Sequence, residues 1–141
     1  EKPDAPSCAK SREPILEVLR DHFHDRRRVL EIGSGTGQHA IFSANTLHIM
    51  PWLAVERLFA GLPEILAEQA KVAIYGPFNY GGQFTSESNA RFDASLKASA
   101  PHQGIRDFDD LDALARRAGM TLAEDVTMPS NNRCLVWCRV G

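Results

Sequence analysis

The chain has 141 residues, 43% of them apolar and 24% charged, so it can bury a core and has the size of one domain spanning residues 1–141. Its formal net charge is −2, with basic residues clustered only at 26–28, which argues against nucleic acid as a partner. No apolar run approaches the roughly 20 residues of a membrane span, and three cysteines without a C-x-x-C pair disfavour a disulfide framework or a zinc site. We therefore expect a soluble, cytoplasmic α/β protein with neither a membrane nor a metal among its partners.

Predicted helices and strands alternate along the chain. Apolar residues at helical spacing indicate the helices, and short apolar runs that end in glycine or turn residues indicate the strands. In chain order the elements are a helix at 15–23, strands at 29–32 and 41–47, a helix at 52–68 with a break near Pro63, a strand at 71–76, helices at 89–98 and 109–118, and strands at 120–128 and 133–140. This alternation predicts a mostly parallel sheet with helices on both faces, and the last two strands predict an antiparallel edge.

A glycine-rich loop follows the strand at 29–32 and leads toward a helix. It reads Leu-Glu-Ile-Gly-Ser-Gly-Thr-Gly over 30–37. Glycines let the backbone approach a ligand closely, and the free N–H groups of a helix N-terminus attract a carboxylate or phosphate. The G-x-G-x-G spacing is not that of a P-loop and weakens a dinucleotide interpretation. A tight turn without a ligand is the structural alternative.

This loop resembles the first motif of class I S-adenosylmethionine-dependent methyltransferases. More narrowly, the chain resembles a bacterial methyltransferase-like family of unknown function, through its stretches at 12–16, 31–39, 42–49, 75–82, 88–93, 104–108 and 128–133. The resemblance implies a Rossmann-like sheet with an antiparallel last strand, S-adenosylmethionine as the methyl donor, and a small-molecule acceptor that remains unidentified. It also implies a donor site that includes Glu31, Gly33, Ser34, Gly35 and Gly37.

The second and third strands of that sheet have no room in this chain. The stretch from Phe42 corresponds to the family's fourth strand, yet it begins only a few residues after Gly37. Two strands with their helices would need on the order of 50–60 residues. We therefore expect a segment to be absent between about 40 and 41. The alternative is a continuous chain in which 48–56 forms the second strand, ending at Glu56.

Polar and aromatic residues after two predicted strands are the candidate site. His48 is the candidate catalytic base, and Asn45 would hold the methionine part of the donor, because both follow a strand whose carboxyl end should face the cleft. Phe78, Asn79 and Tyr80 follow the next strand and are candidates for the acceptor pocket. The structural alternatives are a histidine that packs at the strand–helix corner and a simple turn at 77–82.

Two other function classes fit parts of the pattern. A non-catalytic module that binds S-adenosylmethionine or a nucleotide and regulates a partner would have the same loop chemistry. A nicotinamide-dependent reductase would need a Tyr-x-x-x-Lys pair, which neither Tyr75 nor Tyr80 provides. The oligomeric state stays open, with a homodimer as one option.

Overall fold

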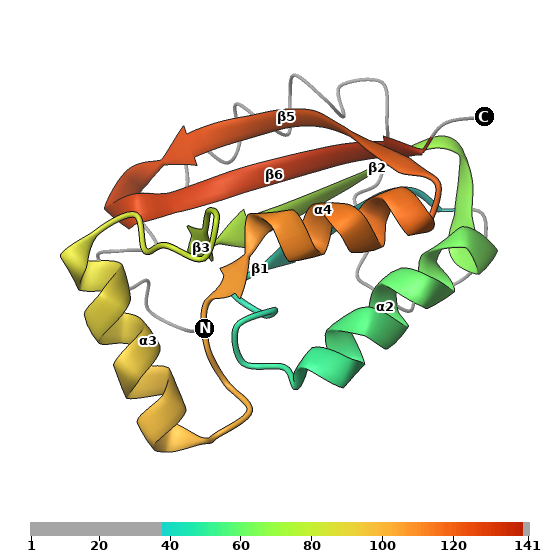
Figure 1. Ribbon diagram of the computed structural model, residues 1–141. Coiled ribbons are helices and arrows are strands. Elements are labelled where there is room, and N and C mark those ends of the chain that lie inside the picture. The colour runs from blue at the N-terminus through green and yellow to red at the C-terminus, as the bar shows by residue number, and fades with distance from the viewer. Residues whose placement is uncertain (1–37, 140–141) are drawn as a thin grey trace, which may run out of the picture.

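The computed structural model describes residues 38–139, shown in colour in Figure 1. The predicted helix at 15–23 and the predicted strand at 29–32 lie outside these residues. In chain order the described elements are β1 (Gln38–Ala44), α2 (Trp52–Ile65), β2 (Leu66–Gly76), β3 (Phe78–Asn79), α3 (Glu87–Ser99), β4 (Arg106–Asp107), α4 (Phe108–Arg117), β5 (Met120–Met128) and β6 (Asn132–Arg139). None of the helices in this part of the chain has the length and apolar character needed to cross a bilayer.

The main sheet has four strands in the order β1-β2-β6-β5. Strands β1 and β2 run parallel, with Ile41 opposite Val72, whereas β6 runs antiparallel to both of its neighbours, β2 and β5. This arrangement confirms the predicted α/β class and its antiparallel edge. Strands β3 and β4 form a separate parallel pair beside the ends of the main sheet (Figure 1).

The two inner strands are buried on both faces. In β2 the run from Val72 to Gly76 is buried, and in β6 the run from Cys134 to Trp137 is fully buried. A strand covered on both faces needs apolar side chains at successive positions, which explains why these segments are continuous apolar runs. The core therefore lies on both sides of β2 and β6.

Helices α2 and α4 lie on one face of the sheet (Figure 1). The indole ring of Trp137 packs edge-on against Phe59 of α2, with ring centroids 6.1 Å apart, and its Nε1 donates a hydrogen bond of 3.0 Å to Asp112 of α4. Burying a side chain such as Phe59 stabilises the fold by about 1.5–3 kcal/mol. One residue of β6 thus joins both helices to the sheet.

Several predicted boundaries are wrong. The helix predicted at 52–68 ends at Ile65, because the backbone of Leu66 is already extended and Leu66 pairs with Gln38 of β1. The strand predicted at 41–47 is β1, which ends at Ala44 and is followed by a turn. The alternative strand at 48–56 is also wrong, since helix α2 begins at Trp52.

Candidate active site at the carboxyl ends of β1 and β2

Strands β1 and β2 are parallel, so their carboxyl ends meet at one edge of the sheet. Ala44 lies opposite Tyr75, and the Asn45 amide donates a hydrogen bond of 2.9 Å to the Tyr75 carbonyl. Asn45 has a φ of 54°, a left-handed conformation that asparagine tolerates better than most residues. The chain therefore turns sharply at the end of β1.

Three of the predicted site residues converge on Gly76, the last residue of β2. A Cβ atom built on Gly76 would lie 3.8 Å from Oδ1 of Asn45, 3.9 Å from Nδ1 of His48 and 3.9 Å from Cζ of Phe78. These side chains come from the turn after β1 and from β3. The fold thus places an amide, an imidazole and an aromatic edge around one glycine, at the sheet edge where open α/β sheets bind their ligands.

His48 is buried and surrounded by protein groups. Its side chain packs edge-on against Phe92 of α3, with ring centroids 5.3 Å apart, and its backbone carbonyl accepts a hydrogen bond of 3.0 Å from the Gly104 amide. The residue is 7% exposed. Burial lowers the pKa of His48 below its ordinary value of 6.5, and the nearby positive charge of Arg106 lowers it further. A neutral imidazole can accept a proton, so the side chain has the protonation state of a base at neutral pH.

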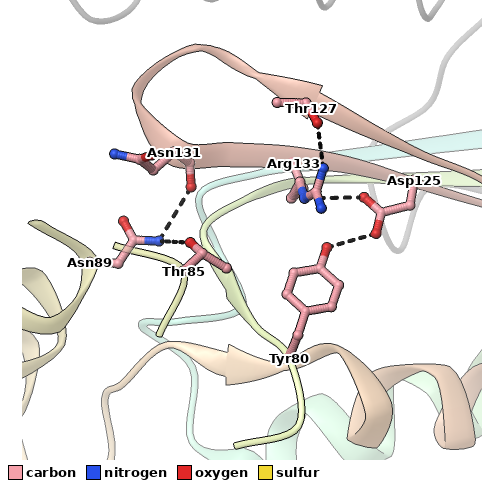
Figure 2. A network of polar contacts seen from close by, with 7 residues as sticks. All are labelled: Tyr80, Thr85, Asn89, Asp125, Thr127, Asn131 and Arg133. Carbon is pink, nitrogen blue, oxygen red and sulfur yellow. Dashed lines mark hydrogen bonds and ion pairs between the residues drawn. The ribbon is translucent and has the colours of Figure 1, made fainter. Parts of the chain in front are cut away.

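Asn79 and Tyr80 have different surroundings. Oδ1 of Asn79 is buried and has no hydrogen-bond partner within residues 38–139, which leaves an acceptor for a donating group. The Tyr80 hydroxyl donates a hydrogen bond of 2.7 Å to Asp125 of β5 (Figure 2), and its ring stacks on Phe108 at 5.4 Å. Burial and then the Asp125 carboxylate raise the pKa of Tyr80 above its ordinary value. The Tyr80 hydroxyl is therefore protonated at neutral pH and fixed in place by its hydrogen bond to Asp125.

Tyr80 also belongs to a larger polar network. Arg133 of β6 lies 5.2 Å from the Tyr80 ring centroid and pairs with the Asp125 carboxylate at 3.6 Å (Figure 2). The Tyr80–Gln83 turn is closed by two backbone hydrogen bonds between its end residues, at 3.0 and 3.1 Å. Tyr80 therefore anchors the loop after β3 to the antiparallel hairpin, a role that its sequence position does not indicate.

A second cluster in Figure 2 connects α3 to the same hairpin. The buried amide of Asn89 donates hydrogen bonds of 3.0 Å to Thr85 Oγ1 and 3.3 Å to the carbonyl of Asn131. The Asn131 amide in turn donates to Ser88 at 3.1 Å. Sequence reasoning missed Asn89, although Ser86 three residues earlier is an N-cap that marks the start of α3.

The predicted site residues divide into groups. Asn45, His48 and Phe78 lie together, and Tyr80 is turned toward β5, as described above. The predicted donor-binding residues of the glycine loop lie outside the described part of the chain: Glu31, Gly33, Ser34, Gly35 and Gly37. Within residues 38–139, no three His, Cys, Asp or Glu side chains are placed to hold a metal ion.

Several solved structures that share this fold are described as methyltransferases. An O-methyltransferase family protein from Burkholderia thailandensis has a TM-score of 0.65 at 13% identity, covering 98% of this chain and 42% of its own. The mitomycin 7-O-methyltransferase MmcR has a TM-score of 0.65 at 16% identity, covering 97% of this chain and 40% of its own. CalO1, a methyltransferase in calicheamicin biosynthesis with bound S-adenosylhomocysteine (SAH), has a TM-score of 0.58 at 16% identity, covering 71% of this chain and 29% of its own. The chain has the Rossmann-like methyltransferase fold and spans less than half the length of these proteins.

The family itself is shown by a sequence-family model. The model described as "Protein of unknown function (DUF938)" matches residues 2–44 and 40–139, which together cover nearly the whole chain. The chain therefore belongs to the DUF938 family.

Proposed function

We propose that the intact protein binds S-adenosylmethionine and transfers its methyl group to a small molecule. The observation that carries this proposal is the convergence of Asn45, His48 and Phe78 around Gly76, at the carboxyl ends of two parallel strands. The methyltransferase fold of the structural neighbours supports it, and one of those neighbours was solved with SAH bound.

The donor would lie between the glycine loop and this edge of the sheet. We propose that Gly33, Gly35 and Gly37, together with Glu31 and Ser34, hold its methionine part, with Asn45 at the end of β1 as a further contact. When bound, S-adenosylmethionine supplies a methyl group on a positively charged sulfur. Two features of the described site fit a donor and an acceptor. Gly76 leaves room for a further atom among three side chains, and Oδ1 of Asn79, which we assign to the acceptor pocket, is buried with its hydrogen-bonding capacity unused within residues 38–139.

His48 would act on the methyl acceptor. A hydroxyl or amine that becomes methylated loses a proton, and a neutral imidazole next to Gly76 can accept it. General-base catalysis of this kind contributes about 10²–10⁴-fold to turnover. We propose that Phe78 and Asn79 contact the acceptor, with Tyr80 fixing the loop that carries them. An acceptor that is already free of its proton would need His48 only for orientation.

We also propose that the intact protein carries a further segment between about 40 and 41. The family model matches in two pieces that meet at 40–44, which supports this idea. A tryptic mass map of the intact protein tests the idea. Peptides that account for on the order of 50–60 additional residues are expected, and a peptide that joins Ala40 directly to Ile41 would overturn it.

Binding and transfer separate the proposed function from its alternative. Calorimetry should detect SAH binding, and labelled S-adenosylmethionine incubated with a metabolite library should pass its methyl group to an acceptor. SAH binding without turnover on any tested acceptor would favour the non-catalytic binding module.

A further inference from the structure

The side chain of Arg106 in β4 donates hydrogen bonds to backbone carbonyl groups before and after His48. Its Nε donates a hydrogen bond of 3.2 Å to the Leu47 carbonyl, and its Nη2 donates to the Met50 carbonyl. The same Nη2 donates at 2.9 Å to the carbonyl of His102. One side chain therefore fixes the beginning and the end of the turn that carries the candidate base.

The N-terminal residue of α2 packs against the same side chain. The guanidinium carbon of Arg106 lies 5.6 Å from the centroid of the Trp52 ring, a distance at which a cation is attracted to the face of an aromatic ring. Because Trp52 is the first residue of α2, Arg106 joins the turn to this helix as well as to β4.

The backbone before Arg106 is itself tightly held. The Gly104 amide donates to the His48 carbonyl, and the Ile105 amide donates at 2.8 Å to Oδ1 of Asp93 on α3. A Cβ atom at Gly104 would lie only 3.1 Å from that carboxylate oxygen and 3.2 Å from Cε of Lys97, so glycine allows the close approach. Lys97 pairs with the other carboxylate oxygen of Asp93 at 2.8 Å. The segment 104–106 is thus fixed between α3 and the His48 turn.

We propose that Arg106 is a positioning residue, which holds the turn at 47–50 so that His48 faces Gly76 and the reacting groups. This inference rests on the proposed function, because it takes His48 to act in methyl transfer. It gives a role to the stretch Gly-Ile-Arg-Asp-Phe at 104–108, which no part of the proposed chemistry uses.

The chemistry of this contact requires arginine. A guanidinium group offers five N–H donors in a rigid planar fork, so it can reach carbonyl groups that lie in different directions, whereas the ammonium group of lysine donates from a single point. Its positive charge also disfavours protonation of the neighbouring imidazole. Among the charged side chains around the turn, Asp93 of α3 pairs with Lys97 and also acts electrostatically on Arg106, and the positive charge of Arg106 acts on His48.

Two substitutions of Arg106 distinguish the effect of its planar guanidinium group from the effect of its positive charge. Arg106→Lys keeps the charge and loses the fork, and Arg106→Gln loses both. We expect each to lower kcat by roughly 10–100-fold, since displacing a reacting group by about 1 Å costs on the order of 10²-fold, while SAH affinity changes less than about twofold. In a ring-NMR titration, the pKa of His48 should rise in Arg106→Gln and stay near its starting value in Arg106→Lys. The control is Arg91→Gln, because Arg91 is an exposed residue of α3 whose ion pair with Glu87 spans 3.9 Å.

Hydrogen exchange tests the same contact without any turnover. The Ile49 amide donates to the Thr46 carbonyl at 3.1 Å, and the Gly104 amide donates to His48, so both report on the held turn. Exchange at these two amides should accelerate at least roughly tenfold in Arg106→Lys, relative to the wild-type protein and to Arg91→Gln, because local opening needs fewer bonds to break. If Arg106→Gln does not fold, Arg106→Lys decides the question alone.

The outcomes for Arg106 and for the proposed function are distinguishable. Wild-type kcat in Arg106→Lys, or unchanged exchange at both amides, would overturn the positioning role even if the protein transfers methyl groups. Faster exchange in Arg106→Lys, in a protein that binds no SAH and transfers no methyl group, would establish the structural contact and overturn both the proposed function and the positioning role that depends on it.

Discussion

Gly76→Ala is a small change at the point where the candidate site residues meet. The added Cβ atom would lie 3.8–3.9 Å from Asn45, His48 and Phe78, which is ordinary van der Waals contact. No atom has to move to admit it, and the φ of Gly76 is not among the left-handed glycine angles of the chain. Replacing glycine by alanine at a compatible position raises the free energy of unfolding by about 0.4–1 kcal/mol, because the unfolded chain becomes less flexible.

The same methyl group should strongly impair turnover. It would fill space in which we propose that donor and acceptor approach each other, and misplacing a reacting group by about 1 Å costs on the order of 10²-fold in rate. We therefore expect a variant that is as stable as the wild-type protein or slightly more stable, with kcat/KM lowered by about two orders of magnitude. A structural turn at this position would predict the stability gain alone.

Urea unfolding and methyl transfer from labelled S-adenosylmethionine would be measured on the same preparations. Gly61→Ala is the matched control, because a Cβ atom at Gly61 has no neighbour within 4 Å and the residue lies inside α2. Alanine in a helix interior is favoured over glycine by about 0.8–1 kcal/mol, so this variant should gain stability and keep its turnover. Unchanged turnover in Gly76→Ala would refute the placement of the reacting groups, and a marked loss of stability would refute the steric reasoning.

Three further predictions concern His48 and Tyr80. His48→Ala should lower turnover by roughly 10²–10⁴-fold with little change in SAH affinity, and unaltered turnover with an unaltered pH profile would leave His48 a packing residue. Because the pKa of His48 is lowered from 6.5 in the folded protein, the unfolded chain binds this proton more readily. The free energy of unfolding should therefore fall as the pH drops below about 6.5, and this pH dependence should be weaker in His48→Gln. The same pH dependence in the wild-type protein and in His48→Gln would contradict the lowered pKa of His48. Tyr80→Phe removes the hydrogen bond to the Asp125 carboxylate and should lower the free energy of unfolding in urea by about 1.5–3 kcal/mol, whereas an unchanged midpoint would show that this bond contributes nothing.

Local signals in the sequence were sufficient for most of the sheet. The strand predicted at 120–128 is β5, and the strand predicted at 133–140 is β6 within one residue at each end. Their apolar runs and the turn residues between them are properties of adjacent positions. The end of α2 was missed because Leu66 and Ala67 continue an apolar pattern, while pairing with β1 across the sheet draws this part of the chain into β2.

For the site residues too, local sequence signals predict some features, whereas contacts between distant residues are not predicted. The placement of Asn45 and His48 at this edge could be predicted because both lie within four residues of the end of β1, and the carboxyl ends of parallel strands meet at one edge of the sheet. The contact between Tyr80 and Asp125 joins residues 45 positions apart in the sequence, so no local pattern predicts it. The hydrogen bonds of Arg106 could not be predicted either, because its partners are backbone carbonyl groups, which every residue possesses.

The most direct test of the central claim is a calorimetric titration of the intact protein with SAH, with Gly35→Val as the paired variant. If the protein is an S-adenosylmethionine-dependent methyltransferase with the proposed donor site, the wild-type protein should bind one equivalent of SAH. A bulky side chain in the glycine loop would occupy space needed by the methionine part of the ligand, so Gly35→Val should bind much more weakly. Absence of SAH binding by the wild-type protein would contradict the proposed function, and equal affinity in the two proteins would contradict the placement of the donor at the glycine loop.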